Sequence, residues 1–291
     1  MKLLVIGGSG FVSGTLARVA RGAGHQVWTL TRGQRPALPG VTALVADRQD
    51  PAAVERVLAS TQTDWDLAVD CIGFKPADAR QDIAVFAPRA RQLVFISTDF
   101  VYDPTRRQLP QPEEPAHYVT ADYGGDKRQC ELEFLNSDNS WTILRPCHIY
   151  GPGSLLGCLP EHGRDPQLLD TLRSGQPLRL VGGGLFRQQP IHVRDLAMLI
   201  LSIAGKATTH RQIFNCAGPD IIESREYYRI VAEVLGVELR VTAVSMQEVS
   251  PFLCHRIYDL GKLRQAGLTM PATPITAGLQ EHTRSLLTQS G

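Results

Sequence analysis

No apolar run in this 291-residue chain reaches about 18 residues, the length that a membrane-spanning helix needs. Its first residues lack the apolar stretch and small-residue cleavage site of a secretory signal peptide. A cytoplasmic protein without membrane contacts is therefore predicted. The chain also lacks an excess of charge of either sign, because it has 30 basic and 29 acidic residues. This balance gives no sign of a nucleic-acid-binding protein.

The cysteines form no C-x-x-C pair. The six residues are Cys71, Cys130, Cys147, Cys158, Cys216 and Cys254. They are scattered, and several lie in apolar runs, so buried free thiols are predicted and a metal site is not. With 43% hydrophobic and 20% charged residues, the composition suits a globular protein of one large domain, alone or with a smaller lobe.

Apolar runs alternate with helical patterns over the first half of the chain. The strand candidates are Leu3–Ile6, Val27–Thr31, Ala43–Ala46, Leu67–Cys71, Leu93–Ser97 and Thr142–Arg145. The helix candidates are Phe11–Arg21, Pro51–Ala59, Ala77–Phe86 and Tyr123–Leu135. This alternation is typical of a parallel sheet covered on both faces. The pattern predicts an α/β fold with a Rossmann-type doubly wound sheet over residues 1–150.

Proline and glycine interrupt the chain between residues 151 and 190. Short helices are expected at Pro166–Arg173, Val193–Ala204, Ser224–Leu235 and Ile275–Leu287. Residues 151–291 are expected to form mainly a smaller α+β substrate-binding lobe, with some segments around 185–217 returning to the Rossmann domain. Doubly wound sheets bind ligands at their carboxyl edge, so the lobe is expected to close over that edge.

The most informative motif is the turn after the first predicted strand. Residues 7–14 read GGSGFVSG, and a helical pattern follows. Gly7 and Gly10 let the backbone approach a pyrophosphate, while free N–H groups at the helix start, around Phe11 and Val12, face it. Between a strand and a helix, this turn predicts a nicotinamide dinucleotide site.

The end of the second predicted strand bears on the choice of cofactor. An NAD site usually has an acidic residue there, whereas this chain has Thr31 and Arg32. A guanidinium can bind a ribose 2′-phosphate, and Arg35 could share that role, so NADP is predicted and NAD is the second choice. Asp47 either accepts from the adenine amino group or caps the helix that starts near Pro51.

Tyr123 and Lys127 lie four residues apart, on one face of a predicted helix. A nearby cation lowers the pKa of a tyrosine, which makes Tyr123 a candidate acid/base. Ser97 and Thr98 follow the fifth strand, where a hydroxyl can bond a substrate oxygen. Gly125 either admits a bulky substrate near the backbone or marks tight helix packing.

Together these motifs resemble those of the extended short-chain dehydrogenases/reductases, of the NAD-dependent epimerase/dehydratase family. The resemblance covers nearly the whole chain. Besides the glycine turn and the Tyr123–Lys127 pair, it rests on STDFVY at 97–102, RPCHIYGPG at 145–153 and PIHVRDLA at 190–197.

The resemblance implies roles for individual residues. Tyr123 would be the proton donor and acceptor, Lys127 would hold the nicotinamide ribose and tune Tyr123, and Thr98 would take the Ser/Thr role. Further cofactor contacts would come from Cys71, Ile72, Gly73 and Pro146. A homodimer through a four-helix contact is also implied.

The chain departs from the family pattern at three positions. Ser13 stands in place of the third glycine, and its small size makes it a tolerated variant. Phe100 follows Thr-Asp where the sugar 4,6-dehydratases have a glutamate, which disfavours water elimination. Gln188 stands where sugar-nucleotide enzymes place a phosphate-binding arginine, although Arg187 precedes it.

Residues that contact the substrate are the least determined by the sequence. The candidates are Asp99, His148 and Arg187. Arg164, Arg179 and Arg256 are further polar candidates, and for these three and His148 a surface or structural role is favoured over a ligand contact. The substrate is expected to be a small molecule, and a sugar nucleotide by resemblance.

The sequence predicts an NAD(P)-dependent epimerase that oxidises a carbinol transiently and returns the hydride, with Tyr123 as acid/base. An NADPH-dependent keto-sugar reductase is the alternative, favoured by Arg32 and the Thr-Asp-aromatic motif. A 4,6-dehydratase is less favoured. A non-catalytic dinucleotide-binding regulator or RNA-associated protein is the rival from another class, and intact Thr98, Tyr123 and Lys127 argue against it.

Overall fold

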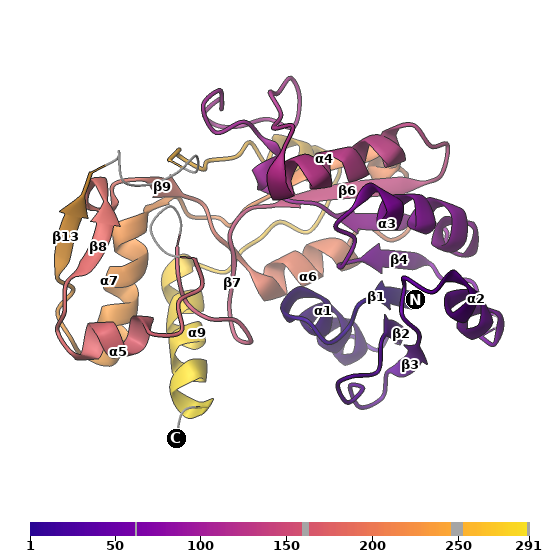
Figure 1. Ribbon diagram of the computed structural model, residues 1–291, viewed down its shortest axis with the longest axis horizontal. Coiled ribbons are helices and arrows are strands. Elements are labelled where there is room, and N and C mark those ends of the chain that lie inside the picture. The colour runs from indigo at the N-terminus through magenta and orange to yellow at the C-terminus, as the bar shows by residue number, and fades with distance from the viewer. Residues whose placement is uncertain (62, 159–162, 246–252, 290–291) are drawn as a thin grey trace.

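A seven-stranded parallel sheet forms the centre of the protein (Figure 1). The computed structural model describes residues 1–61, 63–158, 163–245 and 253–289. The sheet has the order β11-β6-β5-β4-β1-β2-β3. Its strands are β1 (Lys2–Ile6), β2 (Gln26–Thr31), β3 (Thr42–Val45), β4 (Leu67–Asp70), β5 (Leu93–Ile96), β6 (Trp141–Pro146) and β11 (Gln212–Cys216). The predicted Rossmann-type doubly wound sheet is confirmed, with β11 as an additional edge strand from the second half of the chain.

Helices cover both faces of this sheet. One face carries α1 (Phe11–Gly22) and α6 (Val193–Leu201), which pack against each other and enclose one apolar core. The other carries α2 (Pro51–Ala59), α3 (Pro76–Gln81) and α4 (Asp122–Leu135) over a second core. Burial on both sides explains why the inner strands are continuously apolar: Leu3, Leu4, Val5 and Ile6 are all fully buried.

The smaller lobe lies beside the sheet domain in Figure 1. Its helices are α5 (Leu168–Arg173), α7 (Ser224–Leu235) and α9 (Ile275–Gln289), and β8 (Leu178–Val181) pairs in parallel with β13 (Val241–Val244). Two short pairs, β7 (Ile149–Tyr150) with β10 (Ile191–His192) and β9 (Arg187–Gln188) with β12 (Ile222–Glu223), connect the regions. Helix α8 (Gly261–Gln265) packs near β11. A third apolar core unites α5, α7 and α9.

Local sequence explains several element boundaries. Helix α2 begins where predicted because Asp50 caps its first turn, accepting from the Ala53 N–H at 3.0 Å, and Pro51 follows. The predicted helix at 77–86 is instead α3 followed by a π-helical turn from Asp82 to Phe86. Among the described residues, no helix is long and apolar enough to cross a membrane.

Candidate active site

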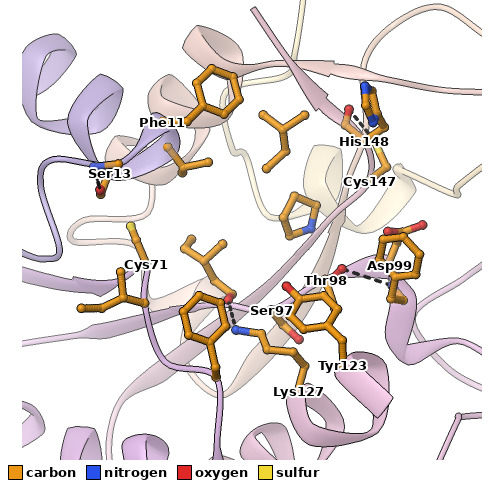
Figure 2. Close-up of a pocket in the computed structure, with 18 of the residues that line it drawn as sticks. Phe11, Ser13, Cys71, Ser97, Thr98, Asp99, Tyr123, Lys127, Cys147 and His148 are labelled. Atoms are coloured by element: carbon orange, nitrogen blue, oxygen red, sulfur yellow. Dashed lines mark hydrogen bonds between the residues drawn. The ribbon is translucent and has the colours of Figure 1, made fainter. Parts of the chain in front are cut away.

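The carboxyl ends of β1, β4, β5 and β6 meet at a cavity of about 570 Å³ (Figure 2). It is lined at one end by the start of α1, along its floor by the segments after β4 and β5, and at the other end by the segment after β6 and by Arg164 and Arg256. A second hollow continues from the glycine turn toward the ends of β2 and β3. This is the edge where open parallel sheets bind ligands.

The glycine turn has the geometry of an anion site. Gly7 and Gly8 have φ angles of 109° and 130°, which disfavour other residues. A Cβ on Gly8 would lie 2.6 Å from the Thr29 side chain. Helix α1 has neither a side-chain cap nor an acidic residue in its first turn. Its first N–H groups are therefore oriented for a dinucleotide pyrophosphate, and the residues present fit that group.

The hollow at the end of β2 is basic. Thr31, Arg32, Arg35 and Asp47 all line it, and Arg35 donates to the Ser9 carbonyl at 2.9 Å. Both arginines are exposed, and the structure gives neither of them a carboxylate partner within the described residues. Two exposed guanidinium groups therefore lie beside the glycine turn.

Asp47 does not cap helix α2. Its carboxylate accepts from the Gln49 N–H at 3.0 Å, and the cap is Asp50. The capping alternative for Asp47 is therefore wrong, and its position in the basic hollow leaves the adenine contact as the remaining interpretation.

Lys127 joins two strand ends beneath the cavity. Its ammonium donates to the carbonyl of Gly73 at 2.7 Å, after β4, and to that of Ile96 at 2.6 Å, at the end of β5. The side chain is buried and lies over the Phe95 ring, with Nζ 4.1 Å from its centroid. Burial lowers the pKa of Lys127. The ammonium thus fixes the two segments that form the cavity floor.

Tyr123 is half-exposed and lies at the cavity wall beside Thr98, with Lys127 below (Figure 2). Burial raises the pKa of Tyr123, and a hydrogen bond to the Thr98 hydroxyl acts in the opposite direction without cancelling it. The structure gives no support to the expected lowering of this pKa by Lys127, whose ammonium donates to two backbone carbonyls. A raised pKa keeps the phenol protonated near neutral pH.

Ser97 has a different environment from Thr98. Its hydroxyl is buried and donates to Glu131 of α4 at 2.6 Å. Glu131 in turn accepts two bonds from the buried Arg145 of β6, at 3.0 and 2.8 Å. Ser97 therefore ties the end of β5 to α4, and Thr98 supplies the hydroxyl next to Tyr123.

Asp99 lines the cavity, but its carboxylate is committed to protein groups. It is buried and pairs with Arg256, with the Tyr258 hydroxyl and, at 3.4 Å, with Arg107. Although burial alone would raise it, these arginines hold the pKa of Asp99 below its usual value. The Asp99 carboxylate therefore has little capacity left to bind a substrate directly. Its partner Arg256 lines the same cavity.

His148 and Arg164 form the far wall of the cavity. Burial and the charge of Arg164 lower the pKa of His148 to about 3, so the imidazole is neutral at physiological pH. Arg164 lies over Phe11, with its Cζ 5.2 Å from the ring centroid, and donates to the Ile149 carbonyl at 3.3 Å.

The structure does not bring Arg187 into the cavity. This residue is exposed and lies with Leu185, Glu223 and His255 at a separate shallow depression. The neighbouring Gln188 is buried and is not among the cavity's lining residues. The predicted Arg187 contact with substrate finds no support in this placement. Arg179 lies on β8, also away from the cavity.

Most of the other predicted cofactor residues line one of the two hollows. Gly10, Phe11, Val12, Cys71, Ile72 and Pro146 line the cavity, and Gly7 lines the second hollow. Gly73 lines neither, although its carbonyl accepts from Lys127. All six cysteines, including Cys71 at this wall, are free thiols. Among the described residues no cluster of potential metal ligands is found.

Two aromatic residues near Tyr123 were not predicted as lining residues. The rings of Phe100 and Phe74 lie 6.1 and 6.5 Å from that of Tyr123. Phe74 had a weak signal, because it directly follows the Cys-Ile-Gly segment after β4.

The two glycines after Tyr123 allow helix α4 to approach the backbone closely. A Cβ on Gly124 would lie 2.1 Å from the Phe100 carbonyl oxygen, and one on Gly125 would lie 2.6 Å from the Thr120 carbonyl carbon. The structure therefore supports the tight-packing interpretation of Gly125.

Comparison with known proteins agrees with this geometry. Residues 3–217 match the profile of the NAD dependent epimerase/dehydratase family. The chain belongs to this family. Membership indicates a nicotinamide-dinucleotide-dependent enzyme of the epimerase or oxidoreductase kind.

The names of two curated relatives of this chain describe different activities. The 2'-dehydrokanamycin reductase of Streptomyces kanamyceticus is 26% identical over 90% of this chain and 78% of its own length. The chloroplast stem-loop binding protein of 41 kDa b of Arabidopsis thaliana is 29% identical over 75% of this chain. The match spans 58% of that protein's length.

The fold of the family is also seen in solved structures. The UDP-glucose 4-epimerase of Thermotoga maritima, solved with UDP-glucose, superposes with a TM-score of 0.80 over the whole of both chains at 18% identity. This likeness shows the common architecture.

The neutral His148 predicts a pH dependence of stability. The unfolded chain protonates this residue below its ordinary pKa of 6.5, whereas the folded protein does so only near 3. The unfolded state therefore binds more protons, and stability falls as pH drops from 6.5 toward 3, by at most roughly 1.4 kcal/mol per pH unit from this group. His148→Gln removes this contribution. The free energy of unfolding of the variant is therefore expected to increase relative to that of the wild type as the pH is lowered from 7 to 5.

Urea unfolding at the two pH values measures the difference. The exposed His210 provides the control His210→Gln, which is expected to keep the wild-type pH dependence. Equal pH dependence in His148→Gln and the wild type would contradict the neutral state of His148.

Proposed function

We propose that this protein is an NADPH-dependent reductase that converts a ketone of a small-molecule substrate to an alcohol. The observation that carries the proposal is the pair Arg32 and Arg35 at the end of β2, where an NAD-specific site has a carboxylate. Two exposed guanidinium groups beside the glycine turn suit a 2′-phosphate. The relative from Streptomyces kanamyceticus is named a reductase, which supports the same reaction type.

The residues that would hold the dinucleotide follow the length of the two hollows. The first turn of α1 would bind the pyrophosphate, Arg32 and Arg35 the 2′-phosphate, and Asp47 the adenine. Lys127 and the segment 71–73 would hold the nicotinamide ribose, next to Pro146. The bound nicotinamide would supply the hydride.

Tyr123 and Thr98 handle the substrate oxygen in this proposal. The ketone oxygen gains negative charge as its carbon accepts hydride, and a proton must reach it. Tyr123, whose phenol is protonated at neutral pH, donates that proton. The Thr98 hydroxyl orients the phenol and can hydrogen-bond the same oxygen. Lys127 holds the two strand ends in register beneath them.

An epimerase that oxidises a carbinol and returns the hydride to the opposite face is the second candidate. The same residues would serve it, and the chain's fold matches that of a UDP-glucose 4-epimerase. The two differ in one observable: an epimerase retains its dinucleotide through the cycle, whereas a reductase consumes NADPH. A dehydratase has no support at Phe100, which has no carboxyl group. A cytoplasmic homodimer that acts on a sugar nucleotide stays a prediction from the sequence.

Cofactor preference tests the observation on which the proposal rests. In the double variant Arg32→Ala/Arg35→Ala, the dissociation constant for NADPH is expected to rise by about 100-fold or more, since two charged hydrogen-bond partners are lost and each costs about 1.5–3 kcal/mol. Affinity for NADH is expected to change little. Titration of nicotinamide fluorescence measures both.

Arg91→Ala is the matched control, because Arg91 is exposed and precedes β5 at the opposite edge of the sheet. It is expected to bind both dinucleotides as the wild type does. A parallel loss of NADH and NADPH affinity, or no loss in the double variant, would contradict the assignment of the 2′-phosphate.

A further inference from the structure

Two buried arginines share one carboxylate at the floor of the cavity. Arg107 and Arg256 both pair with Asp99, and all three side chains are almost completely buried. Tyr258 completes the cluster: its hydroxyl donates to Asp99 and accepts from Arg107 at 2.9 Å. Burial raises the pKa of Tyr258, so this residue stays neutral. The cluster carries two positive charges and one negative charge.

The second positive charge has no anionic partner in the described part of the chain. An uncompensated buried charge costs several kcal/mol, and such charges are normally paired. Arg107 at least distributes its donors, because it also bonds the Asp99 backbone carbonyl at 2.8 Å. The buried Nε of each arginine has no hydrogen-bond partner. Arg107 bonds through both of its other nitrogens, whereas Arg256 bonds only Asp99, through Nη1, so Arg256 has more unused donors.

Arg256 also lies where a substrate would be. It lines the cavity together with Tyr123 and Thr98, whereas Arg107 does not. Its guanidinium lies over the Phe100 ring, with Cζ 4.6 Å from the centroid, and that ring in turn contacts Tyr123. One aromatic side chain therefore separates the proton donor from the unpaired cation. Figure 2 shows Asp99 and Tyr123 on adjoining parts of the cavity wall.

We propose that Arg256 binds a carboxylate of the substrate, so that the substrate is a keto acid whose anionic group lies a few bonds from the reacting carbonyl. This assignment rests on the proposed reductase function. The carboxylate would complete the charge balance of the cluster, and a guanidinium presents donors in the spacing that a carboxylate accepts. His148 stays neutral on the same wall and can add a hydrogen bond.

A single carboxylate suits the site better than a nucleotide diphosphate. The unmatched charge is one unit, and it is buried close to Tyr123. The position at which sugar-nucleotide enzymes have their phosphate arginine is the buried Gln188, and Arg187 is outside the cavity. Arg256 comes from the segment beside Gln188: its N–H donates to the Arg187 carbonyl at 2.8 Å. This backbone pairing places a single cation, Arg256, beside Gln188 and at the cavity wall.

Binding to the enzyme–NADP⁺ complex tests the proposal without turnover. Calorimetry would compare 3-oxohexanoate with its uncharged methyl ester and with UDP. We expect the wild type to bind the acid at least tenfold more tightly than the ester. In Arg256→Met, the dissociation constant of the acid is expected to rise about 10- to 100-fold, with the ester and NADP⁺ unchanged.

Arg187→Met is the matched control, because it removes an exposed arginine from the adjoining segment and is expected to leave all these constants unchanged. Arg256→Lys keeps the charge and covers the case in which Arg256→Met does not fold. It is expected to retain the preference for acid over ester with a smaller loss of affinity.

The outcomes separate this inference from the function on which it rests. Equal binding of acid and ester by the wild type, or UDP binding that depends on Arg256 and exceeds that of the acid, would overturn the carboxylate assignment even if ketones are reduced. Acid binding that depends on Arg256, without reduction of any ketone by NADPH, would uphold the site and reject the reductase.

Discussion

Tyr123→Phe is expected to reduce turnover by about 10²- to 10⁴-fold, the contribution typical of a positioned acid/base. The variant loses only the phenolic oxygen, so the ring keeps its contacts with Phe74 and Phe100. Cofactor affinity and the unfolding free energy are therefore expected to stay near the wild-type values. Steady-state kinetics with NADPH and fluorescence titration of NADPH measure the two effects separately.

A control for a lost hydroxyl is available close by. Tyr118→Phe also removes one phenolic oxygen, but Tyr118 is not among the residues that line the cavity. It is expected to keep most of the activity. A Tyr123→Phe enzyme with wild-type turnover would show that another group protonates the substrate.

Arg145→Met is expected to destabilise the protein by about 3–5 kcal/mol, the cost of breaking a buried ion pair by removal of one partner. Arg145 and Glu131 are both fully buried and share two hydrogen bonds. The guanidinium holds the pKa of Glu131 below its usual value against the effect of burial. Without Arg145, the Glu131 carboxylate loses its main partner and becomes protonated or hydrated.

The control is the second arginine on the same carboxylate. Arg128 bonds Glu131 at 2.8 Å but is partly exposed, so Arg128→Met is expected to cost about 1 kcal/mol or less. Urea unfolding at neutral pH compares the two variants. Similar small losses in both would mean that the buried pair contributes little. Because Glu131 also holds Ser97, the activity of Arg145→Met is expected to fall with its stability.

Local patterns predicted much of the fold because they are set by neighbours in sequence. The helix at Pro51–Ala59 was predicted with its observed bounds, since Pro51 and Asp50 determine its start. The strands of the first half were predicted within about two residues, because burial on both faces requires continuous apolar runs. The π-helical turn after Gln81 was missed, since it has no local signature.

The roles of polar site residues depend on partners far away in sequence. Asp99 was proposed as a substrate contact, but Arg256 and Tyr258, more than 150 residues later, occupy its carboxylate. Ser97 was grouped with Thr98, although Glu131 takes its hydroxyl. The spacing of Tyr123 and Lys127 indicated a direct charge effect, whereas two backbone carbonyls hold the ammonium. Sequence spacing identified these residues, and tertiary contacts determine what each one does.

Transfer of deuterium from labelled NADPH tests the central claim most directly. The enzyme would be mixed with NADPH that carries deuterium at the transferred position and with a panel of 3-oxo acids and keto sugars. Our account predicts that deuterium appears on the new carbinol carbon of at least one product, with one NADP⁺ formed per alcohol, and that Tyr123→Phe abolishes this transfer. Epimerised product without net consumption of NADPH, or no transfer to any member of the panel, would contradict it.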